Sequence, residues 1–385
     1  MTSPTLAHSE ATIATAKRPL KLLIIAGARP NFMKVAPLIK AAQAHNAAVL
    51  DGERRIECRL VHTGQHYDQT MSDIFFQELG IPQPDVNLEV GSGSHAAQTA
   101  NIMLRFEPVL EKERPDWLVV VGDVNSTMAC TLVASKMGVK VAHVEAGLRS
   151  GDRTMPEEIN RLVTDAIADL CLTPSEDGSE NLRREGVAEQ TIRLVGNIMI
   201  DSMVAQLDEA ERGGTLQKLG LKQGEFIYVT LHRPSNVDTE ASLRVIVREL
   251  CEIGSRYQVV FPIHPRTRNR IRDFGLSFEN CSGIRLLEPL GYRDSLMLTK
   301  YARCVLTDSG GLQEESTYFK TPCLTLRPTT ERPVTITIGS NRLTTVETLK
   351  TDLEQALSGP ARRGEPPEFW EGRTAQRIVA ILLNS

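Results

Sequence analysis

The chain has 385 residues, 41% of them hydrophobic and 24% charged, a length and composition typical of two globular domains. Its 44 basic and 48 acidic side chains give a formal charge of −4, so no excess of positive charge indicates nucleic-acid or membrane-surface binding. The apolar runs, such as LLIIAG and WLVVVG, are far shorter than the ~20 residues that span a bilayer. We therefore expect a soluble protein that holds an anionic ligand through local contacts.

The seven cysteines are widely spaced and form no CxxC pair. This pattern predicts buried free thiols in a reducing compartment and argues against a zinc site or a disulfide framework. Residues 1–18 are rich in Ser, Thr and Ala and lack the continuous apolar core of a signal peptide. We therefore expect a disordered leader at 1–18 and a cytoplasmic protein.

From Leu20 onward, short apolar runs alternate with longer amphipathic segments. The first predicted strands are LKLLIIAG, ECRLVHTG and WLVVVGD, followed by helices near 32–45, 68–79 and 126–137. VKVAHVE, DLCLTP and TIRLVGN continue the series, which restarts after a helical stretch at 199–222 with EFIYVTLH, QVVFPIH, GIRLLEP, CVLTDSG and PCLTLRP. Strands that are apolar throughout are buried on both faces, as in parallel sheets covered by helices. The sequence therefore predicts two similar doubly wound α/β domains with a boundary near 197–222.

Polar residues directly follow several of these runs, where open α/β sheets bind ligands. Turn geometry explains Gly, Asn, Asp and Ser at such positions, but not the recurrence of Arg, Glu and His. The residues concerned are Arg29, His62 to His66, Asp123, Glu145, Asn197, His232, His264 and Asp308 to Gly311.

The first turn, GARPNFMK, places Arg29 and Lys34 beside the start of a predicted helix. It lacks the GxGxxG pattern of a dinucleotide site, and a structural turn with a surface arginine stays an alternative. DSGGLQEE at 308–315 also opens a helix, where the N–H groups of Ser309, Gly310 and Gly311 can face a phosphate. Its alternative is an ordinary helix cap followed by a glycine pair.

Three carboxylates, Asp123, Glu145 and Glu157, follow strands or open a helix near one sheet edge. Neighbouring carboxylates can acquire different pKa values and so serve as an acid and a base. His232 can donate to a diphosphate or to a leaving oxygen. The alternative for each carboxylate is a helix cap or an ion pair with Arg149, Arg153 or Arg161. The alternative for His232 is a loop histidine that hydrogen bonds to backbone groups. The histidines show no HxH or HExxH spacing, so we expect no metal site.

Taken together, nine segments in chain order resemble the non-hydrolysing UDP-N-acetylglucosamine 2-epimerases. They are GARPNFMKVAPL (27–38), TGQHYD (63–68), GDVNST (122–127), HVEAGLRSGD (143–152), MPEEINR (155–161), HRPSN (232–236), HPRT (264–267), LTDSGGLQEE (306–315) and TERP (330–333). The resemblance implies the GT-B architecture, with two Rossmann-like domains facing a cleft. Its implied divisions are residues 19–197, a UDP-binding domain at 198–368, and a C-terminal helix in 369–385 that crosses back to the first domain.

The same resemblance implies reversible C2 epimerisation of UDP-GlcNAc and UDP-ManNAc for polysaccharide synthesis, by elimination of UDP to 2-acetamidoglucal and re-addition, without cofactor or metal. It also implies a homodimer. Implied catalytic residues are Asp123, Glu145, Glu157 and His232. Which carboxylate removes the proton and which returns it stays open. Implied substrate-binding residues are Arg29, Lys34, Arg161, Leu290 (uracil), Ser309, Gly310, Gly311 (β-phosphate), Glu315 (ribose) and Arg332.

Two departures from the family pattern stand out. An aromatic residue often follows the Asp of PLGYRD, whereas this chain has Ser295. The uracil base therefore stacks on Tyr292 instead, or its stacking is weaker. Many bacterial members bind UDP-GlcNAc as an activator through a Gln-His pair and the second Arg of HRRE. Gln65 and His66 are kept, but Pro234 replaces that Arg, and this predicts weakened or absent activation. Alternative functions are a GT-B glycosyltransferase, a 2-epimerase of another UDP-2-acetamido sugar such as a 2,3-diacetamido uronate, and a UDP-sugar sensor.

Overall fold

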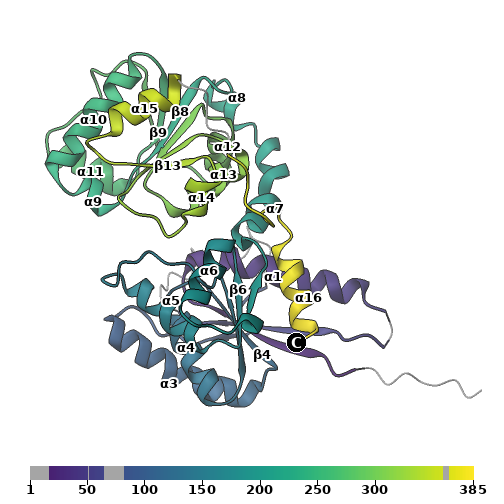
Figure 1. Ribbon diagram of the computed structural model, residues 1–385. Coiled ribbons are helices and arrows are strands. Elements are labelled where there is room, and N and C mark those ends of the chain that lie inside the picture. The colour runs from purple at the N-terminus through teal and green to yellow at the C-terminus, as the bar shows by residue number, and fades with distance from the viewer. Residues whose placement is uncertain (1–16, 51, 65–81, 359–363) are drawn as a thin grey trace, which may run out of the picture.

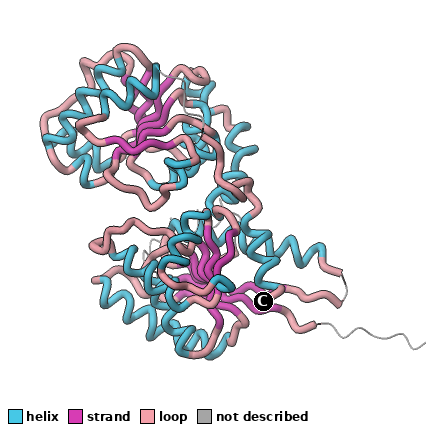
Figure 2. Tube along the Cα trace, viewed as in Figure 1, coloured by secondary structure: helices cyan, strands magenta, loops and turns pink. Residues whose placement is uncertain are grey.

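The protein folds into two α/β lobes, which a computed structural model describes for residues 17–50, 52–64, 82–358 and 364–385. Figure 1 shows the lobes stacked one above the other with helix α7 (Ile198–Arg212) at their junction. In both lobes the strands form a central layer with helices on the outside (Figure 2). The predicted leader lies almost wholly outside the described residues, and so does the helix expected near 68–79.

The first lobe is built on a seven-stranded parallel sheet in the order β3-β2-β1-β4-β5-β6-β7. Its strands are β1 (Leu20–Ala26), β2 (Ile56–His62), β3 (Val86–Asn87), β4 (Trp117–Val121), β5 (Lys140–Val144), β6 (Leu170–Thr173) and β7 (Ile192–Leu194). Its helices are α1 (Arg29–Ala48), α3 (His95–Glu113), α4 (Asn125–Lys136), α5 (Pro156–Ile167) and α6 (Glu176–Arg184), with a short 3-10 turn at Glu189–Thr191. Separate cores on the two faces, one under α1 and one under α3 and α4, explain why the central strands are apolar throughout.

The second lobe repeats this plan with a six-stranded parallel sheet in the order β10-β9-β8-β11-β12-β13. Its strands are β8 (Phe226–Thr230), β9 (Gln258–Pro262), β10 (Ile284–Leu287), β11 (Cys304–Thr307), β12 (Cys323–Leu326) and β13 (Asn341–Thr344). Its helices are α8 (Thr215–Leu219), α9 (Pro234–Val237), α10 (Glu240–Gly254), α11 (Pro265–Asp273), α12 (Tyr292–Tyr301), α13 (Gly310–Phe319), α14 (Val334–Thr337) and α15 (Leu349–Ser358). The prediction of two doubly wound α/β domains is confirmed.

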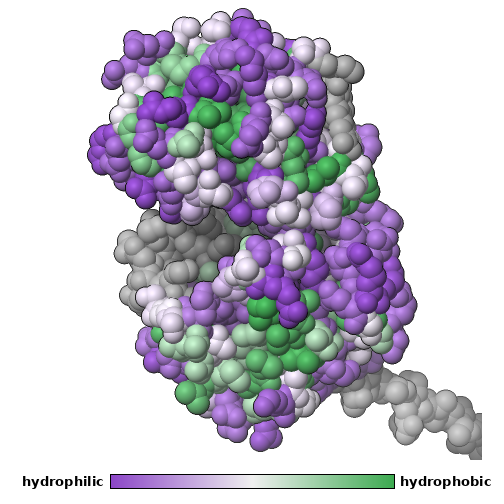
Figure 3. All heavy atoms as spheres, turned by 60° about the vertical axis from the view of Figure 1, so that its left-hand side comes forward, coloured by the Kyte–Doolittle hydropathy of each residue, from purple (hydrophilic) through white to green (hydrophobic). Residues whose placement is uncertain are grey.

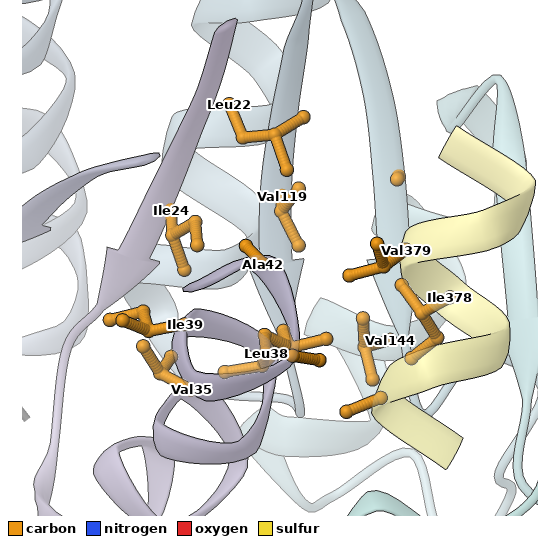
Figure 4. Close-up of a cluster of buried hydrophobic side chains, with 14 of the residues drawn as sticks. Leu22, Ile24, Val35, Leu38, Ile39, Ala42, Val119, Val144, Ile378 and Val379 are labelled. Atoms are coloured by element: carbon orange, nitrogen blue, oxygen red, sulfur yellow. The ribbon is translucent and has the colours of Figure 1, made fainter. Parts of the chain in front are cut away.

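The last helix, α16 (Thr374–Leu383), packs on the first lobe although it follows the second in sequence. Ile378 and Val379 of α16 lie in the same buried cluster as Leu38 of α1 and Val144 of β5 (Figure 4). Asp201 of α7 accepts hydrogen bonds from the backbone N–H groups at the start of α16, at 3.0 and 2.8 Å. The C-terminal helix is thereby fixed to both the first sheet and the junction helix.

The expectation that all seven cysteines are free thiols is wrong for two of them. Cys251, near the end of α10, and Cys281, in the loop before β10, form a disulfide with their Cα atoms 4.9 Å apart. Thirty residues separate them in sequence, so their pairing arises from tertiary packing and leaves no short spacing pattern. The other cysteines are free, and of these only Cys58 is not fully buried. No helix in the described part of the chain is both long and apolar enough to cross a membrane.

Candidate active site

Each sheet reverses its strand order once, between β1 and β4 in the first lobe and between β8 and β11 in the second. Ligands of doubly wound sheets bind beyond the carboxyl ends of the strands at this reversal. Asp123 follows β4 in the first lobe, whereas His232 and Asp308 follow β8 and β11 in the second. Figure 3 shows the groove that separates the lobes.

The turn after β1 is held by Asn31, which sequence reasoning missed. Its Oδ1 accepts hydrogen bonds from the N–H groups of Gly27 and Ala28, both at 2.9 Å, and its Nδ2 donates to the Val121 carbonyl at 3.1 Å. The turn is therefore joined to the end of β4, next to Asp123. Arg29 begins α1, and its side chain lies outside the described parts of the structure.

Lys34 and Glu145 form a buried ion pair in the first lobe. Glu145 directly follows β5 with a φ of +70°, a left-handed conformation that is uncommon outside glycine and frequent at functional sites. Its Oε2 faces Lys34, whereas its Oε1 is buried and has no hydrogen-bond partner among the described residues. A buried carboxylate oxygen without a partner is costly, so Glu145 has one oxygen available for a ligand.

Asp123 is held by Arg161, which donates to its Oδ2 from Nη2 at 2.6 Å and from Nε at 3.1 Å. Burial alone would raise the pKa of Asp123, but the charges of Arg161 and Lys34 outweigh it and hold this pKa below its usual range. The preceding residue, Gly122, has a φ of +68°, and a Cβ there would lie 2.7 Å from Lys34 Nζ. The backbone therefore approaches the Lys34–Glu145 pair closely.

Glu157 and Glu158 both lie in the first turn of α5 but have different surroundings. Glu157, the predicted catalytic residue, is half-buried and its carboxylate makes no hydrogen bond or ion pair within the described ranges. Glu158 is buried, accepts from the N–H groups of Ser150 and Gly151 and pairs with Arg161 at 2.7 Å. Glu158 thus orients the arginine that holds Asp123, a role that the sequence did not reveal.

In the second lobe, Arg332 is buried between two carboxylates. Its Nε donates to Glu314 Oε1 at 2.5 Å and its Nη1 to Glu331 Oε1 at 2.7 Å. Burial would raise the pKa of Glu331, but the charges of Arg332 and Arg327 hold it at about 2. Burial raises the pKa of Glu314, with Arg332 opposing and Glu145 adding to the rise.

The two lobes bring these charges together into one cluster. Arg332 of the second lobe lowers the pKa of Asp123, and Glu145 of the first lobe raises the pKa of Glu314. Charges act on each other in this way only over short distances. We define the interlobe cluster as Lys34, Asp123, Glu145, Arg161, Glu314, Glu331 and Arg332.

Ser309, Gly310 and Gly311 begin α13 directly after β11 and Asp308. The Ser309 N–H donates to Thr307 Oγ1 at 3.0 Å, whereas the N–H groups of the glycines, in the first helical turn, have no intrahelical acceptor. A Cβ on Gly310 would lie 3.4 Å from Arg332 Nη1. Two backbone donors and a guanidinium therefore converge, which suits an anion.

His232 lies two residues beyond the end of β8 and beside Asp308. Its Nδ1 is 3.1 Å from Asp308 Oδ1, and Asp308 also accepts from the backbone N–H groups of His232 and Arg233. Burial would raise the pKa of Asp308, but these hydrogen bonds and the charge of His232 lower it. The His264 ring lies against that of His232, with 5.4 Å between their centroids.

Glu315, predicted to bind ribose, is buried in α13 beside Tyr292 of α12. Burial raises its pKa to about 8, with the hydroxyl of Tyr292 opposing this and the charge of Glu314 adding to it. Leu290 lies half-buried before α12 and packs with the apolar cluster under that sheet face. Ser295 hydrogen bonds to the Tyr228 hydroxyl at 2.7 Å.

Of the predicted site residues, the structure thus brings five together in the interlobe cluster: Lys34, Asp123, Glu145, Arg161 and Arg332. Gln65 and His66, the predicted regulatory pair, lie outside the described residues, while Pro234 begins α9 and is exposed. In the part of the chain that is described, no group of three or more His, Cys, Asp or Glu side chains could hold a metal ion.

Comparison with known proteins connects this arrangement to one family. The family model described as UDP-N-acetylglucosamine 2-epimerase matches residues 48–383. A UDP-N-acetylglucosamine 2-epimerase from Methanocaldococcus jannaschii is 42% identical over 372 residues, covering 94% of this chain and 99% of that protein. A UDP-2,3-diacetamido-2,3-dideoxy-D-glucuronate 2-epimerase from Pseudomonas aeruginosa is 40% identical, with 94% and 99% covered.

A solved structure leads to the same conclusion. The crystal structure of the Methanocaldococcus jannaschii enzyme in complex with UDP-GlcNAc and UDP superposes with a TM-score of 0.80, covering 95% of this chain and 100% of that one. It shares the two-lobed architecture, and the coverage is nearly complete in both directions. The chain therefore belongs to the non-hydrolysing UDP-N-acetylglucosamine 2-epimerase family.

Proposed function

We propose that the protein interconverts UDP-GlcNAc and UDP-ManNAc by inverting carbon 2 of the sugar. The observation that carries the proposal is the interlobe cluster, in which Asp123 and Glu145 lie beside Lys34, Arg161 and Arg332. Carboxylates can exchange the C2 proton, and the cations suit a diphosphate leaving group. The names of its relatives support the same substrate.

The C2 proton of the sugar is not acidic, so direct proton exchange is disfavoured. In the reaction that we propose, a base removes the C2 proton while the C1–oxygen bond to UDP breaks, giving 2-acetamidoglucal and UDP. UDP then adds back to C1 as an acid protonates C2 from the opposite face. Every atom and electron pair is conserved, so the reaction is redox-neutral.

In this scheme the free Oε1 of Glu145 is one proton-transfer atom, and Asp123, fixed by Arg161, supplies a second carboxylate. Glu157 is a further acid/base candidate, and His232 contacts the departing diphosphate. The β-phosphate lies against the N–H groups of Gly310 and Gly311 at the start of α13, with Ser309 beside them. Arg29, Lys34, Arg161 and Arg332 complete the charged surround, Glu315 accepts from the ribose and Leu290 borders the uracil.

Incubation with UDP-GlcNAc in deuterated water tests the function. We expect UDP-ManNAc to form and deuterium to appear at C2 of both sugars, because the returning proton comes from solvent-exchanged carboxylates. Mass spectrometry and proton NMR measure both. Release of free ManNAc with UDP would indicate a hydrolysing enzyme, and a lack of exchange would exclude epimerisation of this substrate.

A second candidate substrate is a UDP-2,3-diacetamido uronic acid. The Pseudomonas aeruginosa relative with that name is 40% identical over nearly the full chain, almost as close as the UDP-GlcNAc epimerase. We favour UDP-GlcNAc because the chain has TERP at 330–333, one of the motifs in which it resembles the UDP-GlcNAc enzymes. The ratio of kcat/KM for the two sugars decides between them.

Glu315 makes UDP binding dependent on pH. Its pKa of about 8 keeps it protonated at neutral pH. A carboxylate, however, is the better acceptor for the hydrogen bonds that two ribose hydroxyls donate. Binding therefore lowers this pKa and releases a proton, and UDP affinity should rise with pH up to about 8. Titration calorimetry in buffers of different ionisation enthalpy measures the proton. Glu315→Gln should bind UDP more weakly and without the Glu315-linked release, and equal release by both proteins would contradict the role.

Activation by UDP-GlcNAc should be weak or absent, because Pro234 stands where many bacterial members have an arginine. We expect hyperbolic kinetics with UDP-ManNAc as the only substrate, and activity without added UDP-GlcNAc. Initial rates over a range of UDP-ManNAc concentrations test this. A sigmoidal curve, or a dependence on added UDP-GlcNAc, would show that Gln65, His66 and neighbouring groups form a working activator site.

We further infer from the family that the protein is a cytoplasmic homodimer whose product enters polysaccharide synthesis. The family resemblance supports all three statements. Sedimentation equilibrium of the purified protein measures its oligomeric state.

A further inference from the structure

A fully buried histidine in the first lobe lies outside the set of residues assigned above. His143 is in β5, two residues before Glu145, and none of its surface is exposed. Its Nδ1 is 2.6 Å from Asp165 Oδ1, and its Nε2 is 2.8 Å from the Gly122 carbonyl oxygen. Both of its ring nitrogens therefore face a hydrogen-bond acceptor.

The two hydrogen bonds lead to different loops of the proposed active site. Gly122 precedes Asp123, so the Nε2 bond fixes the backbone that carries one carboxylate. On the other side, Asp165 Oδ2 accepts from the Gly147 N–H at 3.0 Å. Gly147 lies two residues beyond Glu145, so the second bond reaches, through Asp165, the turn that carries the other carboxylate.

Asp165 is well suited to transmit this contact. It is buried in α5 and pairs with Arg149 at 2.7 Å, which in turn pairs with Glu185 at 2.6 Å. Burial would raise the pKa of Asp165, but the charge and hydrogen bond of His143, and then Arg149, hold it below its usual range. Asp165 therefore stays a carboxylate that accepts at both oxygens.

We propose that His143 is a positioning residue that holds the Asp123 loop and the Glu145 turn at a fixed separation through its two ring nitrogens. The inference rests on the proposed function of these two carboxylates. The Glu145 turn needs such support, because Glu145 has a left-handed backbone at φ +70°, which is strained for a residue other than glycine. A misplacement of about 1 Å at a reacting group lowers rates by about 10²-fold.

Two substitutions of His143 test its hydrogen bonds to Gly122 and to Asp165 separately. In His143→Gln the new amide nitrogen takes the place of Nε2 and can reach Gly122, but its oxygen faces the Asp165 carboxylate. In His143→Asn the amide nitrogen takes the place of Nδ1 and can reach Asp165, but not Gly122. We expect each to lower kcat by about 10²-fold, with little change in the Kd for UDP.

A second substitution should restore part of the loss. Asp165→Asn in the His143→Gln background offers an amide N–H to the new oxygen, while its own oxygen still accepts from Gly147 and Arg149. The pair should recover about tenfold in kcat over His143→Gln. Cys130→Ala, a buried change in the apolar cluster under α4, is the control and should leave kcat unchanged.

Amide hydrogen exchange without substrate tests the arrangement independently of the reaction. His143→Asn should speed exchange in residues 122–124, and His143→Gln in residues 145–147. This pattern decides the proposal even where wild-type protein fails to turn over UDP-GlcNAc or a double variant fails to fold. Uniform exchange changes across the lobe, single variants with wild-type kcat, or a loss of UDP affinity equal to that of kcat would each overturn it.

Discussion

Replacing Glu145 by glutamine is expected to lower kcat by about 10²–10⁴-fold, the contribution typical of a positioned acid or base. Glutamine has nearly the same shape and can still accept from Lys34, but its amide cannot exchange a proton at Oε1, the oxygen that has no partner in the described structure. Asp123→Asn is expected to lose turnover for the same reason. Steady-state rates in both directions, and calorimetry of UDP binding, measure the two effects separately.

UDP binding should survive both substitutions, since the proposed β-phosphate contacts, at Ser309, Gly310 and Gly311, belong to the second lobe. Glu180→Gln, the same chemical change on an exposed carboxylate of α6, is the matched control and should behave like wild type. Turnover by Glu145→Gln or Asp123→Asn within tenfold of wild type would show that the assignment of that residue is wrong.

Much of the fold could be predicted because parallel strands covered on both faces must be apolar along their whole length. Every strand predicted from such a run is present, including WLVVVGD as β4 and CVLTDSG as β11. The two strands that were missed are at sheet edges, β3 with two residues and β13 with the sequence NRLT. Edge strands have one neighbour, so they can be short and polar, and such runs resemble loops.

The site was less predictable, because adjacent residues on a helix face different directions. Glu157 and Glu158 are equivalent in sequence, yet only Glu158 is buried and bound to Arg161. Asn31 and Asp165 act by holding backbone groups distant in sequence, which no motif spacing reveals. His143 did carry a signal, since a polar side chain inside the buried run VKVAHVE requires partners. No spacing pattern in the sequence indicated the Cys251–Cys281 disulfide.

Replacing Arg332 by methionine is expected to destabilise the protein by about 3–5 kcal/mol at neutral pH, the usual cost of removing one partner of a buried ion pair. Methionine fills part of the volume but leaves Glu314 without its cation and Glu331 with Arg327 alone. Urea unfolding at pH 7 measures the free energy of unfolding. Arg293→Met is the control, because Arg293 forms an exposed pair with Glu209 and its loss should cost less than about 1 kcal/mol.

The pH dependence of this difference identifies its cause. In the wild type, Glu331 has a pKa of about 2, against an ordinary value of 4.5, so it contributes stability above pH 4.5 that is lost as the pH falls toward 2. Without Arg332 this contribution shrinks, and protonation of Glu314 removes the cost of its buried charge. The difference in the free energy of unfolding between variant and wild type should therefore become smaller as the pH falls from 7 to 4. A difference in the free energy of unfolding that stays constant over this pH range would indicate that packing was lost instead. A difference below about 1 kcal/mol at pH 7 would contradict the buried pairing.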